Sequence, residues 1–344
     1  MDRYCILQKK DFPEFIAKVS ENNKVVAPVA KGHGNFAFEE VKGGDQVSIK
    51  YVPTILPPKK YFMPQKEKIT QYDKRTHSGD PVIEYDELVI FGVHTCDLAG
   101  IQCLNMVFTT KPKDINYIIR KHKLTIIGLE CNDYCDDYAS CSIMRNHLPK
   151  GGYDLFFTEL TDVFLVHKNT IEGEKIIRDT DLFSDAESSH MDELEDLRKE
   201  KRKLFNDEFH VDWHELKDLF TKAFDSKVWD DLDKRCLSCG NCTNVCPTCY
   251  CFDMVDEINL DFSTGATYRV WDSCQNETFA KVAGGESFRE TRGQRQRHRY
   301  MRKFYYPLKP YKRPFCTGCG RCSRTCMAKI NMKETVNSIA EELI

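Results

Sequence analysis

The first half of the chain alternates between continuous apolar runs and stretches of helical spacing. Residues 87–93 and 124–129 are apolar runs of buried-strand length. Helical patterns lie between them, at about 98–108 and 115–122. A continuous apolar run is typical of a strand covered on both faces, and strand, helix, strand over this length is the βαβ unit. The pattern therefore predicts two parallel, buried strands.

A strand pair and a charged segment follow. Residues 153–160 and 162–168 are typical of two strands joined by a tight turn. Between about 179 and 206 the composition becomes strongly charged, with only a thin apolar stripe. Such a segment predicts an exposed linking helix and hence a domain boundary. The members of the apolar stripe are Met191, Leu194 and Leu197.

The length of 344 residues exceeds the usual size of one domain. From Trp213 onward, apolar positions again recur at helical spacing, which predicts an amphipathic helix. We therefore predict a mixed fold class with an N-terminal α/β domain that contains a short parallel sheet, over residues 1–180. A charged linking helix over 181–208 would lead to a mainly helical, ferredoxin-like domain over 209–344.

Net charge and apolar runs exclude some classes of partner. The chain has 50 basic and 53 acidic side chains, a net charge of −3, which gives no general reason to expect nucleic acid. Its longest apolar runs are too short to cross a bilayer, and its first residues lack the hydrophobic stretch of a signal peptide. We expect a cytoplasmic protein without membrane insertion.

Cysteine is unusually frequent, with 17 residues, of which 11 lie between Cys236 and Cys326. A reducing cytosol keeps thiols free, so a dense set there indicates metal or redox chemistry rather than disulfides. Cys5 and Cys103 stand alone beside apolar neighbours and are interpreted as small buried hydrophobic residues.

Two cysteine runs share the spacing C-x2-C-x2-C-x3-C, which is typical of ferredoxins with two 4Fe-4S clusters. Three closely spaced thiolates wrap one cubane, whereas the fourth cysteine, carried into a following helix, points toward the partner cluster. Glycines in the runs let the backbone approach the sulfides. The first cluster should take Cys236, Cys239, Cys242 and Cys326, and the second Cys316, Cys319, Cys322 and Cys246.

Zinc is the rival metal, because C-x2-C pairs also build structural zinc sites. A zinc site uses two pairs, so the additional cysteines of each run would have no role. The spacing therefore favours iron-sulfur clusters.

Four further cysteines are predicted to converge on a third site. Cys96 and Cys131 each follow a predicted parallel strand, and Cys135 and Cys141 lie in the same loop as Cys131. The carboxyl ends of parallel strands share one edge of a sheet, where ligands bind. We predict a third iron-sulfur cluster there, with Asp97 as a candidate non-thiol ligand and a structural thiol group as the alternative.

Two other features stay open. Cys249, Cys251 and Cys274 are too few to fill a site with four ligands, and they are either ligands of an incomplete site or groups that tune the nearby clusters. A basic helix over 289–303 is interpreted as offsetting the anionic clusters and docking an acidic partner surface.

Several stretches outside the two runs resemble the iron-sulfur subunit of anaerobic sulfite reductase and of sulfhydrogenase-type cytosolic NiFe hydrogenases. The loop after 127–131 departs from the family pattern, because it is one residue longer and has fewer cysteines. The stretches are Phe91–Ala99, Ile127–Cys131, Cys246–Phe252, Trp271–Cys274, Ala283–Arg289 and Gln294–Arg299.

The resemblance implies a conduit that passes electrons between a flavin and NAD(P)H subunit and a catalytic subunit, with no substrate chemistry of its own. The sequence agrees with a subunit that has no substrate chemistry of its own, because it has no dinucleotide motif G-x-G-x-x-G after a strand, no haem-attachment motif C-x2-C-H and no P-loop. Two alternatives remain. One is a stand-alone reductase with catalysis at the site of Cys96, Cys131, Cys135 and Cys141, and the other is a zinc-stabilised interaction module.

Overall fold

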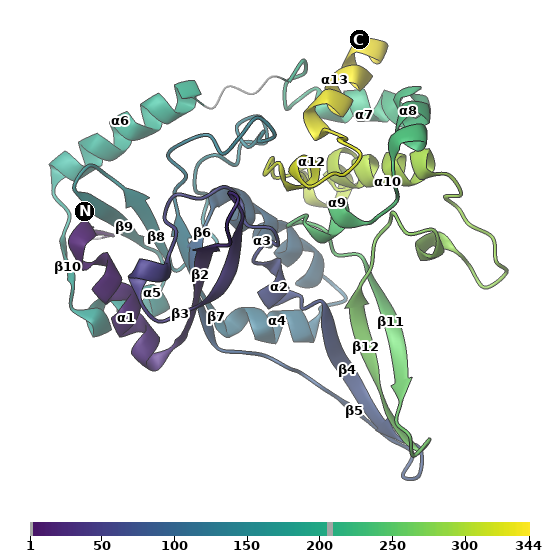
Figure 1. The fold of residues 1–344 in the computed structure, drawn as a ribbon, viewed down its shortest axis with the longest axis horizontal. Coiled ribbons are helices and arrows are strands. Elements are labelled where there is room, and N and C mark those ends of the chain that lie inside the picture. Colours follow the sequence, from purple (N-terminus) through teal and green to yellow (C-terminus); the bar gives the residue numbers. More distant parts are fainter. Residues whose placement is uncertain (1–2, 205–208) are drawn as a thin grey trace.

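A computed structural model describes residues 3–204 and 209–344 of the chain. Its larger sheet occupies one side of the ribbon in Figure 1 and has eight strands. From edge to edge the strands are β10 (Phe183–Asp185), β1 (Tyr4–Gln8), β9 (Val163–Lys168), β8 (Leu155–Glu159), β7 (Leu124–Leu129), β6 (Leu88–Val93), β2 (Lys24–Ala30) and β3 (Phe36–Val41).

The centre of this sheet is parallel and its edges are antiparallel. Strands β2, β6, β7 and β8 pair in parallel, with Ile90 opposite Ile126. Helices α3 (Thr95–Phe108) and α4 (Ile115–His122) connect β6 to β7, which confirms the predicted βαβ unit. Strands β8 and β9 form the predicted antiparallel pair. The sheet is larger than predicted because its edge strands carry weaker apolar patterns.

Helices cover both faces of the parallel strands, as continuous apolar runs require. On one face, α1 (Phe12–Asn22) and α5 (Ile171–Thr180) pack against the sheet, with Phe15 and Phe157 in the same core. On the other face lie α2 (Lys59–Phe62), α3 and α4, whose apolar side chains pack against Ile90 and Phe156. Cys5 and Cys103 are both buried, as expected.

The C-terminal part is mainly helical and has its own core. The predicted amphipathic helix is α7, whose Leu219 and Phe220 pack in that core, and the Phe220 ring stacks on Phe304 at 4.8 Å. Its helices are α7 (Leu216–Lys222), α8 (Val228–Arg235), α9 (Asn241–Asn244), α10 (Arg292–Phe304), α11 (Leu308–Tyr311), α12 (Arg321–Arg324) and α13 (Met332–Leu343). Short 3₁₀ turns lie at Lys9–Asp11, Gly44–Gln46, Ala223–Asp225 and Thr278–Ala280.

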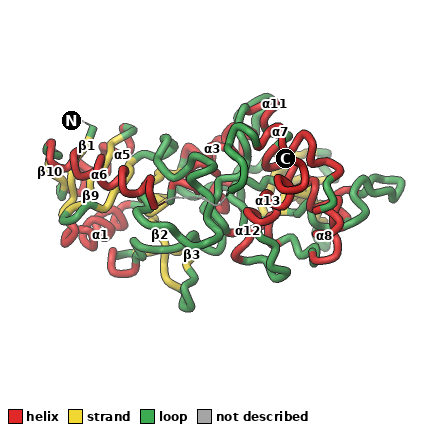
Figure 2. The backbone as a smooth tube through the Cα atoms, turned by 90° about the horizontal axis from the view of Figure 1, so that it is seen from above, coloured by secondary structure: helices red, strands yellow, loops and turns green. Residues whose placement is uncertain are grey.

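Figure 2 shows the molecule from above, with α1 and the strands β1, β9 and β10 at one end and α8, α12 and α13 toward the other. None of the helices in the described residues combines the length and apolar character that a membrane span needs.

A smaller sheet joins strands from both predicted domains. Its order is β11 (Phe252–Ile258), β12 (Thr264–Trp271), β4 (Lys66–Asp73) and β5 (Ser78–Pro81), and it projects as a long ribbon in Figure 1. All of its pairs are antiparallel. The mainly helical region therefore also contributes a β-hairpin. The pairing of β12 with β4 crosses the predicted division between residues 1–180 and 209–344, and that division stays a prediction.

Helix α6 (Ser188–Leu204) occupies the predicted linking segment, but it is less exposed than predicted. Leu194 is buried against the sheet edge. Lys201 and Arg198 both pair with the buried carboxylate of Glu130, at 3.2 and 2.8 Å. Burial would raise the pKa of Glu130, but the two cations hold it below its ordinary value. Residues 205–208, at the end of the predicted linker, lie outside the described residues.

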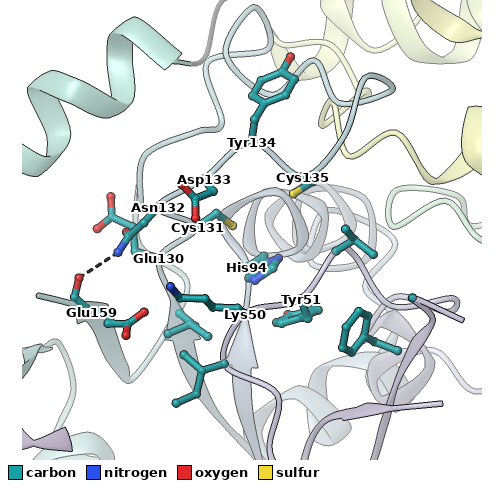
Figure 3. Close-up of a pocket in the computed structure, with 15 residues that line it drawn as sticks. Lys50, Tyr51, His94, Glu130, Cys131, Asn132, Asp133, Tyr134, Cys135 and Glu159 are labelled. Atoms are coloured by element: carbon teal, nitrogen blue, oxygen red, sulfur yellow. Dashed lines mark hydrogen bonds between the residues drawn. The ribbon is translucent and has the colours of Figure 1, made fainter. Parts of the chain in front are cut away.

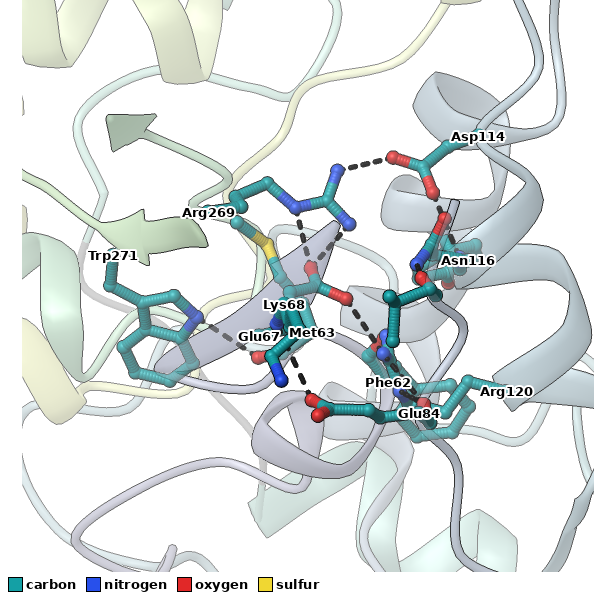
Figure 4. Close-up of polar contacts among 12 residues, drawn as sticks. Phe62, Met63, Glu67, Lys68, Glu84, Asp114, Asn116, Arg120, Arg269 and Trp271 are labelled. Atoms are coloured by element: carbon teal, nitrogen blue, oxygen red, sulfur yellow. Dashed lines mark hydrogen bonds and ion pairs between the residues drawn. The ribbon is translucent and has the colours of Figure 1, made fainter. Parts of the chain in front are cut away.

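A buried ionic network ties the smaller sheet to the α/β part (Figure 4). Glu67 of β4 accepts hydrogen bonds from Arg120 Nη2 of α4 at 2.6 Å and from Arg269 Nε of β12 at 2.5 Å. Arg269 also pairs with Asp114, the N-cap of α4. Glu67 is 1% exposed and is shared by two guanidinium groups, and for Arg120 it is the carboxylate of the pair.

We expect Glu67→Ala to lower the free energy of unfolding by about 3–5 kcal/mol, because it leaves two buried cations without their shared anion. Denaturant unfolding of the anaerobic protein measures this change. Glu257→Ala on the same sheet is the matched control, since Glu257 pairs with Lys66 at the surface and its loss should cost less than about 1 kcal/mol. Equal losses in the two variants would contradict the prediction.

Candidate metal centres

The two cysteine runs adopt the same backbone conformation. Gly240 and Gly320 precede α9 and α12 with φ values of 72° and 71°, a left-handed conformation that suits glycine. Two residues earlier, Ser238 and Gly318 also have positive φ, at 53° and 75°. The neighbours of Gly318 are backbone atoms of Ser140, so this glycine also permits close packing of the loop after β7.

The thiols of the runs line two adjacent cavities, and Cys326 lies with thiols of the first run while Cys246 lies with thiols of the second. Arg299 borders both cavities, and so does Cys322. Zinc needs a single-ion site, and within residues 3–204 and 209–344 no three His, Cys, Asp or Glu side chains are placed to hold one ion. The first cavity is lined by Cys236, Cys239, Cys242 and Cys326, and the second by Cys246, Cys316, Cys319 and Cys322.

Hydrogen-bond donors point at the sulfur atoms of the first cavity. Cys236 Sγ accepts from Gln296 Nε2 at 3.0 Å and from the backbone N–H of Ser238 at 3.4 Å. Cys326 Sγ accepts from the N–H of Ile330 at 3.3 Å. Such donors favour thiolate over thiol, which is the form that binds iron. The donor set therefore fits an iron-sulfur cluster.

The basic helix α10 does not present all of its cations to solvent. Arg295, Arg299 and Lys303 are buried, which corrects the expectation that the whole segment is a docking surface. The reason is the helical spacing, which turns these three residues toward the cysteine runs. Burial opposes the charge of Arg299, but the Cys242 and Cys322 thiolates raise its pKa well above its ordinary value. The expected role in offsetting anionic clusters agrees with this placement.

We expect Arg299→Gln to lower the reduction potentials of both clusters by tens of millivolts or more, because a nearby cation stabilises the more negative, reduced form. A redox titration followed by electron paramagnetic resonance measures both potentials. Arg297→Gln is the control from the same helix, since Arg297 is partly exposed and bonds the carbonyl oxygen of Phe224. A shift in neither cluster would contradict the prediction.

Three of the four cysteines predicted for the third site lie together. Cys96 lies in the first turn of α3, after β6. Cys131 and Cys135 lie in the loop after β7, above His94 and Tyr51 in Figure 3. A hydrogen bond with Cys135 and burial raise the pKa of the Cys131 thiol, and burial together with nearby acidic groups, Cys135 among them, raises the pKa of Cys96. This agrees with the argument that the carboxyl ends of parallel strands meet at one edge.

An open cavity adjoins these thiols. It has a volume of about 350 Å³ and is lined by Tyr51, His94, Cys131 and Cys135, among others. The His94 ring stacks on Tyr51 at 3.8 Å, and burial lowers its pKa to about 3, so it is neutral. Cys141 lies further along the loop, where its backbone nitrogen packs against Gly318 of the second run. The loop therefore connects the third site to the second cavity.

Asp97 pairs with an arginine of the second run, which leaves it poorly suited to be the non-thiol ligand considered from the sequence. Arg321 Nη1 and Nη2 donate to its two carboxylate oxygens at 2.6 and 2.7 Å, and Arg321 Nε donates to Thr54 O at 2.7 Å. Both charged side chains are fully buried. Sequence reasoning missed Arg321, whose only signal was its position between Cys319 and Cys322.

The comparisons with known proteins agree with this geometry. A family described as a 4Fe-4S dicluster domain matches residues 235–330, which contain both cysteine runs. The chain is thus an iron-sulfur protein of the two-cluster class. It is also 35% identical over 346 residues to sulfhydrogenase 2 subunit beta of Pyrococcus furiosus, covering 99% of this chain and 100% of the relative. The chain belongs to this family of sulfhydrogenase beta subunits, which confirms the resemblance seen in the sequence.

Proposed function

We propose that the chain is the electron-transfer subunit of a multisubunit hydrogenase, relaying electrons between a flavin and NAD(P)H subunit and a catalytic subunit. The observation that carries this proposal is the pair of adjacent cavities lined by the eight thiols of the two runs, with Cys322 and Arg299 bordering both. Bound 4Fe-4S clusters would supply one-electron carriers there. The protein would hold them with the crossed ligand sets and stabilise their charge through Arg299.

A third cluster would extend the relay into the α/β part, held by Cys131, Cys135, Cys96 and Cys141. One contact supports its connection to the second cavity. The Asp97–Arg321 pair fixes the segment after Cys96 against the second run. The order along the relay would then be third site, second cavity, first cavity.

The first cavity offers the exit toward one partner. Leu237, which lines it, is 60% exposed, and Met327 beside Cys326 is 79% exposed. The exposed Arg292 donates to the carbonyl oxygen of Cys236 at 2.9 Å, and the exposed Lys329 follows Met327 closely in the sequence. An apolar rim flanked by positive charge fits an acidic partner surface that covers the cluster. In this proposal Arg292 and Lys329, and not the buried Arg295 and Arg299, are the docking cations.

The proposed partner is a hydrogenase rather than a sulfite reductase because the relative named above is a sulfhydrogenase subunit. The stand-alone reductase remains the second candidate, since the open cavity beside Cys131 and Cys135 could admit a small substrate. The zinc-stabilised module is disfavoured by the dicluster match.

Anaerobic purification from native extract at low salt tests the proposal. We expect a brown protein with about eight or twelve irons per chain and no zinc, recovered with partner subunits. The isolated subunit should turn over no substrate when an artificial reductant is supplied. Recovery of this chain alone would contradict the multisubunit role, and turnover by the isolated chain would favour the stand-alone reductase.

A further inference from the structure

Strand β11 forms one edge of the smaller sheet and is open to further pairing. Among the strands of the described residues it pairs only with β12, and all seven of its residues are exposed. The opposite edge strand, β5, is short and ends at Pro81, two features that protect an edge from another strand. Strand β11 contains neither proline nor glycine. Its outer row of backbone N–H and C=O groups can therefore pair with an added strand.

The apolar side chains of β11 and of the turn after it lie in water rather than in a core. The ribbon that carries them projects from the body of the molecule (Figure 1). Neighbouring residues of the strand alternate between its two faces, so both faces take part. Exposed apolar surface gathered on one projecting element is typical of a protein-interaction site. The apolar residues with more than a third of their surface exposed are Phe252, Met254, Val255, Ile258, Leu260 and Phe262.

Hydrogen bonds order the tip of this hairpin. Asp261 Oδ1 accepts from the backbone N–H groups of Ser263 and Thr264 at 3.0 and 2.9 Å, and Asp261 Oδ2 accepts from the Thr264 hydroxyl at 2.8 Å. The N–H of Phe262 donates to Asn259 O at 2.9 Å. The apolar side chains at the tip are thus presented by a built turn, which lowers the cost of ordering the loop when a partner binds.

The charge of β11 indicates the chemistry of its partner. Residues 252–262 contain four carboxylates and no cation. Glu257 pairs with Lys66, but Asp253 and Asp256 take part in no ion pair within residues 3–204 and 209–344. These two carboxylates lie on opposite faces of the strand, because side chains alternate. Lysine or arginine directly opposite them in an added strand would pair favourably.

A second copy of this chain does not fit the open edge. In an antiparallel pair of two β11 strands that matches all seven residues, Asp253 of one copy lies opposite Glu257 of the other. Like charges directly opposite each other destabilise a pair of strands. The carboxylates therefore disfavour pairing of β11 with itself and leave it open to a strand of opposite charge.

We propose that β11 docks an extended, basic segment of a partner subunit, which adds to the smaller sheet as a fifth strand. Backbone hydrogen bonds along the open edge hold the segment, and its cations pair with Asp253 and Asp256. Its apolar side chains cover those of β11, and the apolar tip extends the contact. This proposal rests on the multisubunit role proposed above. It adds a second docking surface, opposite in charge to the cationic rim of the first cavity.

Hydrogen exchange tests the proposal on the chain alone and on the complex purified anaerobically from native extract. We expect amide exchange in β11 to slow at least about tenfold in the complex, because the added strand takes up the outer N–H groups. Exchange in β5 should not change, so the opposite edge is an internal control. A carbodiimide, which joins carboxylates to neighbouring lysines, should cross-link Asp253 or Asp256 to a basic peptide of the partner.

Variants separate charge from apolar contact. The double variant of Asp253→Lys and Asp256→Lys should weaken association with the partner at least about tenfold, and the matching pair of asparagine replacements should weaken it less. Leu260→Ser should also weaken association, because Leu260 is 95% exposed at the tip. Ile171→Ser is the matched control, since Ile171 is 79% exposed on α5, far from the ribbon in Figure 1. All variants should retain their iron, which shows that they fold.

The outcomes distinguish this proposal from the proposed function. Partner subunits that copurify while exchange in β11 stays fast would exclude the added strand and leave the proposed function standing. Full association of the double lysine variant would do the same. A cross-link from β11 to a second copy of this chain would assign the edge to self-association instead. Recovery of this chain alone would contradict the proposed function, and the docked segment with it.

Discussion

Serine at position 326 should remove the cluster of the first run, even though Cys326 belongs to the second run. Cys326 lines the first cavity together with Cys236, Cys239 and Cys242. A hydroxyl is a far weaker iron ligand than a thiolate, so we expect Cys326→Ser to lose about four irons per chain. Iron analysis and electron paramagnetic resonance of the anaerobic variant measure the loss.

Paired variants decide which cluster is lost. The spectrum of Cys326→Ser should match that of Cys236→Ser and differ from that of Cys316→Ser. Because Cys236 and Cys326 serve the same cluster, their double variant should lose no more iron than either single variant. The double variant of Cys316 and Cys326 should lose both clusters. The opposite pattern would show that each run holds its own cluster, and Cys103→Ala controls for loss of a buried cysteine.

Removing the Asp97 carboxylate should separate the second run from the α/β part. Arg321 is buried, and Asp97 is its only anionic partner among the ion pairs of the described residues. We expect Asp97→Ala to lower the free energy of unfolding by about 3–5 kcal/mol, because a buried guanidinium is left uncompensated. Denaturant unfolding measures the change, and iron analysis reports whether the second cavity survives.

Two further variants show whether charge is the cause. Asp136→Ala breaks the pair with Arg324, which lies on the same helix α12 but is partly exposed, and should cost less than about 1 kcal/mol. Replacing Asp97 by Leu and Arg321 by Met together should recover most of the lost stability, since no buried charge then remains. If the double replacement is as unstable as Asp97→Ala, packing and not charge explains the loss.

Local patterns predicted the elements whose side chains are buried in a regular way. The runs at 87–93 and 124–129 became β6 and β7 because a continuous apolar run has few alternatives to a strand covered on both faces. The edge strands and the ribbon of β4, β5, β11 and β12 were not predicted. Strand β11 is exposed along its whole length, so no alternation of buried and exposed positions marks it in the sequence.

The basic helix α10 shows that the sequence also fails to predict which side chains of the site are buried. Its charges are visible in the sequence, but whether an arginine faces solvent or a buried cavity depends on what packs against the helix. Arg295 and Arg299 are buried against the cysteine runs, whereas Arg292 is exposed and reaches the first run only through a hydrogen bond to the Cys236 carbonyl oxygen. The sequence therefore predicted the electrostatic role of the helix and assigned it to more residues than perform it.

The sequence by itself determined the class of protein, because cysteine spacing within a run is a local property that fixes how thiols can surround a cluster. Only the tertiary structure decided the relations between distant segments. It placed Cys326 beside Cys236 and turned Asp97 toward Arg321. Those relations depend on how sheets and helices pack, and packing is set by the summed burial of many side chains rather than by any one stretch of the chain.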